Sequence, residues 1–150
     1  MKRRDCHNRI KAVPRSYKTA VEALQLLDHI VVEQPQYLRQ KNLDQKKIKA
    51  VVQELHNIYF LWMFACFESI LRHYWQNKIR DKKPPTKVLL NRLADKRRVP
   101  DDILDEVQKI RDFRNHLIHE DHNIHHVTSF TIDEASQPLN NFLARLPLQW

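Results

Sequence analysis

The sequence predicts an all-α fold, and three of its features support this: the absence of glycine, the abundance of helix-compatible residues and the helical spacing of apolar residues. The 150-residue chain contains no glycine, the residue that supplies positive φ angles in tight hairpin turns and phosphate-binding loops. This absence argues against β-rich folds and excludes P-loop and dinucleotide-binding fingerprints. Helix-compatible residues are abundant, and apolar residues recur at helical spacing over much of the chain. We therefore expect a compact bundle of four to five helices.

The first helix is expected to run from Ser16, a plausible N-cap, to about Val32. Pro35 then interrupts the pattern. Residues 1–15 are basic and show no apolar periodicity, so they are expected to form a loosely ordered N-terminal arm. Residues 16–150 are expected to form a single domain, because this length is enough to bury a core.

A second, longer helix is expected from near Asp44 to about Arg80. Its middle, residues 58–67 (IYFLWMFACF), is the most apolar stretch of the chain. Ten residues are too few to span a bilayer, so no membrane association is expected. Because this stretch is apolar almost all round, we expect it to be buried on two sides, by the domain's own core and by a second subunit.

Three further helices are expected in the second half of the chain, each with a recognisable start. They begin at Thr86, at Asp101 and at about Asp133. The helix from Asp101 should end near His119 or Glu120. The stretch from His122 to Ile132 is expected to be a loop or a short extended segment. We expect the last helix to end near Leu146.

The formal net charge of +8 indicates a polyanionic partner, most commonly a nucleic acid. A surface that is basic only for solubility is the alternative. The two cysteines, Cys6 and Cys66, lack CxxC spacing and are typical of reduced thiols in a cytoplasmic protein. We expect Cys66 to lie in the core.

Arg114 occupies an unusual position on the helix that begins at Asp101. Advancing by about 100° per residue places it at the centre of the apolar stripe formed by Ile103, Val107, Ile110 and Leu117. A buried guanidinium needs an anionic partner or a cleft. Two interpretations are open: Arg114 pairs with a carboxylate such as Glu68 for structural reasons, or it lines a cleft that receives phosphate.

Asn115 and His119 are four residues apart and share one face of the helix, with Arg111 one turn before Asn115. Arg114 and His119 are separated by about 140° around the axis, so a straight helix cannot aim both at one point. Convergence requires distortion near His119 or a second copy of the helix across a two-fold axis. The second solution predicts a homodimer.

The segment Arg114-Asn115-His116-Leu117-Ile118-His119 resembles the signature of the HEPN superfamily, in which an Arg is followed by four to six residues and a His. The preceding segment from Tyr59 to Trp75, with its Phe-Glu pair, is similar to the family's long aromatic helix. The resemblance covers roughly residues 16–146 in helix order. It implies a helical domain that cleaves RNA without a metal or other cofactor, at a cleft between two subunits.

The implied chemistry fits these residue types. Attack of a ribose 2′-hydroxyl on the adjacent phosphate needs a base, an acid and charge stabilisation. By the resemblance, His119 from each subunit would transfer protons, Arg114 would stabilise the phosphorane, and Asn115 would orient His119 or bind a phosphate oxygen. Glu68, Arg111 and His116 are expected to support this site.

Other interpretations stay open at this point. The histidines at positions 116, 119, 122, 125 and 126 could in principle bind zinc, copper or nickel, although solvated histidines explain them as well. The resemblance points to a toxin–antitoxin or defence system, with an antitoxin or nucleotidyltransferase-like protein as partner. A catalytically inactive module of the same family, binding RNA, a nucleotide or a protein, is the main alternative. A helical interaction protein is another.

Overall fold

The computed structural model describes residues 1–36, 44–79, 83–119 and 127–150, and within these ranges the fold is all-α, as expected. The described helices are α1 (Arg3–Glu33), α3 (Gln45–Lys78), α4 (Thr86–Arg97), α5 (Asp101–His119) and α6 (Ile132–Ala144). None of these five helices is long and apolar enough to cross a membrane.

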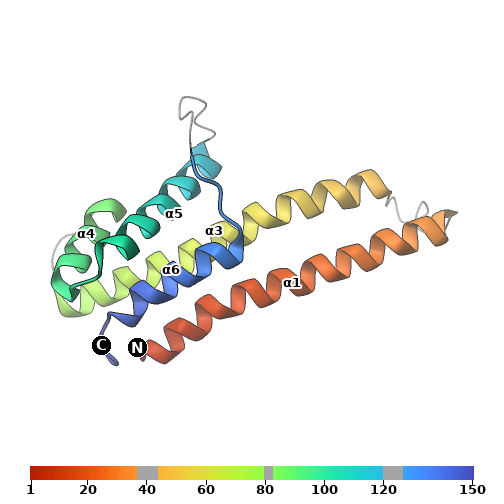
Figure 1. Cartoon of the computed structure of the whole chain (residues 1–150). Helices are drawn as coiled ribbons and strands as arrows, with labels where there is room; N and C mark the ends of the chain where they lie inside the picture. Colours follow the sequence, from red (N-terminus) through yellow and green to blue (C-terminus); the bar gives the residue numbers. More distant parts are fainter. Residues whose placement is uncertain (37–43, 80–82, 120–126) are drawn as a thin grey trace.

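The two long helices, α1 and α3, lie side by side and form the frame of the bundle (Figure 1). Helix α6 packs against α1, α3 and α5, while the short α4 packs against α3 and α5. The second half of α1 and the first half of α3 extend together beyond the other helices as a two-helix arm (Figure 1). The core therefore lies at the other end, around the second half of α3.

Aromatic side chains on α3 join the helices of the bundle. The ring of Phe60 lies edge-on to Phe113 of α5 with centroids 4.8 Å apart. Phe67 contacts Phe142 of α6 in the same manner at 5.7 Å. Edge-to-face pairs of this kind stabilise a fold beyond the area they bury. These contacts fix the position of α5, the helix that carries the candidate site.

The expected N-terminal arm over residues 1–15 is wrong, because α1 is helical from Arg3 and passes through Ser16 without a cap. Cys6, Ile10 and Val13 are buried in the core. They are spaced by four and three residues, so they extend the buried stripe of α1 toward the start of the helix. The basic residues between them and the interior Pro14 obscure this pattern in the sequence.

The expected starts of the other helices are confirmed to within a residue or two. Asp44 caps α3, its side chain accepting a hydrogen bond of 2.8 Å from the Lys47 amide. Thr131 caps α6 in a capping box with Glu134. The backbone and hydroxyl hydrogen bonds from Thr131 lower the pKa of the Glu134 carboxyl. Residues 127–131 are non-helical, as expected, whereas 122–126 lie outside the described residues.

Cys66, which we expected to lie in the core, is only half-buried and packs against the core, whereas Cys6 lies within the core. Cys6 is fully buried at the start of α1, while Cys66 is half-buried on α3. Burial, followed by the charge of Asp5, raises the pKa of the Cys6 thiol. A thiol in this environment stays protonated and acts as a small apolar side chain in the core.

Candidate functional site

Helix α5 presents all the candidate catalytic residues within its last two turns. The helix begins with Asp101 and Asp102, whose negative charges suit a helix N-terminus. Val107 and Ile110 are fully buried and hold the inner face of α5 against the bundle. The residues that follow Ile110 on this inner face of α5 therefore lie beside α3.

Arg114 is half-buried and lies between α5 and α3. Its Nη1 donates a hydrogen bond of 2.9 Å to Oδ1 of Asn115. Its guanidinium carbon lies 5.8 Å from the centre of the buried Phe64 ring, a cation–π contact that steadies the charge without neutralising it. Within the described ranges no carboxylate forms an ion pair with Arg114. Most of its five N–H donors therefore remain available to a ligand.

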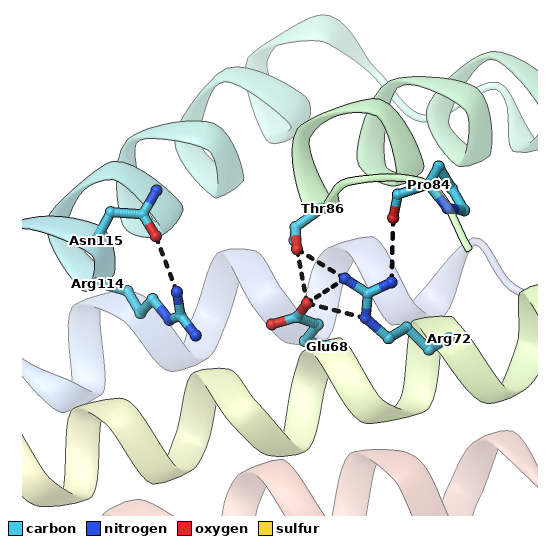
Figure 2. A network of polar contacts seen from close by, with 6 residues as sticks. All are labelled: Glu68, Arg72, Pro84, Thr86, Arg114 and Asn115. Atoms are coloured by element: carbon cyan, nitrogen blue, oxygen red, sulfur yellow. Dashed lines mark hydrogen bonds and ion pairs between the residues drawn. The ribbon is translucent and has the colours of Figure 1, made fainter. Parts of the chain in front are cut away.

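Glu68 is not the partner of Arg114, because it belongs to a separate network (Figure 2). Its Oε1 accepts hydrogen bonds from Nε and Nη2 of Arg72, at 2.9 and 2.6 Å, and from Oγ1 of Thr86 at 2.6 Å. Arg72 also donates to the carbonyl oxygen of Pro84. This network ties α3 to the start of α4.

The protonation of Glu68 follows from the same contacts. Partial burial acts to raise its pKa, but the hydrogen bonds from Thr86 and Arg72 outweigh this and hold the pKa below its ordinary value. The charge of Arg114 contributes least. Glu68 is thus an anion already satisfied by two neighbours, and the structural interpretation of Arg114 as its ion-pair partner is not supported.

Asn115 and His119 lie on the outer side of α5. Asn115 is half-buried through its contact with Arg114, whereas His119, the last residue of the helix, is exposed. Because α5 is helical from Asp101 through His119, the separation of about 140° between Arg114 and His119 applies. Among the described residues, one chain therefore brings Arg114 and Asn115 together but does not bring His119 to them.

Arg111 and His116 carry buried polar atoms without partners. Nη2 of Arg111 pairs with Asp112, but its Nε and Nη1 are buried and have no hydrogen-bond partner among the described residues. The side chain is only 13% exposed. Nδ1 of His116 is likewise buried and unpaired. Such atoms are costly to leave unsatisfied, so this part of α5 lacks hydrogen-bond partners for both side chains.

The structure does not gather the histidines that were considered as alternative metal ligands. Within the described part of the chain, no group of three or more histidine, cysteine or carboxylate side chains is arranged to hold a metal ion. Of the five histidines considered, those at 122, 125 and 126 lie outside the described residues. Neither Arg114 nor His119 lines any of four prominent hollows on the described surface.

Two features of this region were not anticipated from the sequence. One is the Glu68–Arg72–Thr86 network; the spacing of Glu68 and Arg72, four residues apart on one helix, is a pattern that could have indicated the pair. The other is the placement of Phe64 beneath Arg114. This contact joins two helices, and no local pattern in the sequence encodes it.

Comparison of the chain with family models, with curated proteins and with solved structures found no match.

Proposed function

We propose that this protein is an endoribonuclease that cleaves RNA without a metal ion, at a composite site formed by two copies of the chain. The observation that carries the proposal is the state of Arg114. Its guanidinium is fixed by Asn115 and Phe64, keeps most of its donors and has no described carboxylate partner. A positioned, unneutralised guanidinium is suited to bidentate contact with a phosphate.

Nearby cations support the choice of a phosphate ligand. Arg111 places a second guanidinium on α5, three residues before Arg114; its Nη2 pairs with Asp112, and its Nε and Nη1 are buried. The chain as a whole carries a net charge of +8. A polyanion would be attracted over a distance by this net charge.

The second copy is proposed because one chain leaves the site incomplete and exposes large apolar side chains on α3 and α5. Val51, Ile58 and Trp62 on α3 are 46, 59 and 48% exposed, and their spacing places them along one side of the helix. Ile118 on α5 is 45% exposed. Such a series of large exposed apolar side chains is typical of an interface. Ile118 directly precedes His119, so a two-fold contact that buries Ile118 would bring α5 of one copy toward α5 of the other.

The proposed reaction is a transesterification in which every atom of the products except the proton on the new 5′-hydroxyl comes from the RNA. The ribose 2′-oxygen attacks the adjacent phosphorus, and the bond from phosphorus to the 5′-oxygen breaks. One His119 imidazole accepts the 2′-hydroxyl proton, and the protonated His119 of the second copy donates a proton to the departing 5′-oxygen. Arg114 binds the phosphorane oxygens as negative charge develops on them. The products are a 2′,3′-cyclic phosphate and a 5′-hydroxyl end.

The experiment that tests this proposal is incubation of the purified protein with a structured RNA in excess EDTA. We expect fragments whose 3′ ends are 2′,3′-cyclic phosphates. These ends are recognised because a phosphatase cannot remove the phosphate until acid has opened the ring to a monophosphate. Absence of cleavage, or cleavage that only added metal restores, would contradict the proposal. In that case a catalytically inactive module binding RNA, a nucleotide or a protein becomes the better account. A role in toxin–antitoxin or defence systems, with an antitoxin-like partner, is part of the proposal and would be tested after cleavage is established.

A further inference from the structure

A groove follows the line of contact between α1 and α6, away from the Arg114 face. It consists of two hollows of about 410 and 420 Å³, which adjoin because Asp133 lines both. One hollow lies between Lys11 of α1 and Asn140 of α6. The other continues along α1 past Arg15 and Lys18. We call these two hollows together the α1–α6 groove.

One wall of this groove is basic. Lys11, Arg15 and Lys18 line the groove, whereas Arg4 lines neither hollow and continues the same line toward the start of α1. The four residues are spaced by seven, four and three positions, so they lie within about 40° of one line along α1. That line is about 180° around the helix from the buried Val13, and all four side chains are exposed. Lys18 lies 3.9 Å from Glu22, whereas the other three have no carboxylate partner among the described residues.

The length of the basic line suits a nucleic-acid strand. From the first to the last cation it extends over about 21 Å of helix, the length of about six stacked nucleotides at roughly 3.4 Å each. Grooves that bind single strands combine backbone-tracking cations with contacts to the bases, over sites of about 4–16 nucleotides. Three unpaired cations at helical intervals match the first of these requirements.

The opposite wall, on α6, carries neutral hydrogen-bonding groups. Asn140 is held in place, since its Oδ1 lies 2.9 Å from Nδ1 of His7 and its Nδ2 donates to the carbonyl of Ser136. Gln137 and Asn141 also line the groove, and both are exposed. Amide side chains can both donate to and accept from base edges and ribose hydroxyls. The single carboxylate common to both hollows is Asp133.

We infer that the α1–α6 groove binds single-stranded RNA, with phosphates along the basic line of α1 and bases and ribose directed toward the amides of α6. The choice of RNA rests on the proposed function. A single strand fits because only unpaired bases expose their edges to such amides. The groove would hold a part of the substrate remote from the bond that is cleaved at the Arg114 face.

The test measures binding of a fluorescein-labelled 12-nucleotide oligouridine by fluorescence anisotropy over a range of KCl concentrations. All proteins carry His119→Ala, so that the RNA stays intact. In the groove variant, Arg4, Lys11 and Arg15 are replaced by glutamine. The matched control replaces the exposed lysines at 46, 49 and 109 by glutamine, which removes the same charge elsewhere. A second pair compares Asp133→Asn with the exposed Asp105→Asn.

We expect the groove variant to bind at least about tenfold more weakly, with a salt slope reduced by about 2, since each phosphate contact to a single strand contributes roughly 0.7. The control should lose less than about threefold in affinity, and Asp133→Asn should bind more tightly than Asp105→Asn. Equal losses in the two triple variants, or no gain from Asp133→Asn, would overturn the inference.

This binding experiment, read together with the cleavage assay of the wild-type protein in EDTA, distinguishes the groove from the proposed function. If the wild-type protein does not cleave RNA but the groove variant still loses binding selectively, the proposed function fails and the groove stands. If the wild-type protein cleaves RNA and the two triple variants bind alike, the groove fails and the proposed function stands. Circular dichroism of every variant checks that the helical content is unchanged.

Discussion

Replacing Arg114 by alanine is expected to lower the rate of RNA cleavage by about 100- to 1,000-fold, the usual effect of removing a group that stabilises transition-state charge. The guanidinium is fixed by Asn115 and Phe64 and retains free donors, so it can bind the phosphorane without first breaking an ion pair. His119→Ala should reduce the rate by about 10²–10⁴-fold, because it removes proton transfer.

Two comparisons make this result specific to the geometry of the guanidinium. Arg114→Lys keeps the charge but loses the planar fork, so its activity should stay far below that of the wild type. Arg145→Ala removes an exposed arginine of the same charge just beyond α6 and should leave cleavage within about twofold. Single-turnover rates with RNA in EDTA provide the measurement. Cleavage by Arg114→Ala at the wild-type rate would show that the residue has no part in the reaction.

The second large effect concerns stability: Ile10→Ala should lower the free energy of unfolding by about 2–5 kcal/mol. Ile10 is fully buried near the start of α1, in the segment whose sequence indicates a loose arm. Truncating a side chain in a loose arm would cost almost nothing, whereas truncating a core side chain leaves a cavity.

Urea denaturation followed by circular dichroism measures this difference directly. The exposed Asn8, in the same part of α1, provides the control, and Asn8→Ala should change the free energy by no more than about 0.5 kcal/mol. If Ile10→Ala unfolds at the same urea concentration as the wild type, the first turns of α1 do not belong to the core.

These predictions depend on what the sequence can and cannot specify about the fold. The starts of α3, α4 and α5 are recognisable because Asp44, Thr86 and Asp101 mark local changes from turn to helix. The start of α1 is not recognisable in the sequence, because its apolar positions are separated by basic residues and Pro14 lies inside the helix. Only packing against α3 and α6 shows that this proline is tolerated and that the first turns are buried.

The candidate site shows the same division between local and tertiary information. The placement of Arg114 toward the interior and of His119 on another face follows from helical geometry alone. The partner of Arg114 does not follow from helical geometry, since Glu68 could have been assigned to either Arg72 or Arg114. The start of α4 decides the matter, because Thr86 and Pro84 hold Arg72 beside Glu68 (Figure 2). Contacts among three helices of this kind are not encoded in any single segment.

The central claim is that a single site is built from two copies of the chain, and mixing of subunits tests it most directly. Wild-type protein is refolded together with a ninefold excess of His119→Ala, and cleavage is measured per wild-type chain. If both copies supply His119 to one site, only wild-type homodimers are active, and random pairing lowers this activity about tenfold. Refolding with a ninefold excess of Asn8→Ala is the control and should leave the activity per wild-type chain unchanged. Activity per wild-type chain that stays constant in the presence of His119→Ala would contradict the composite site.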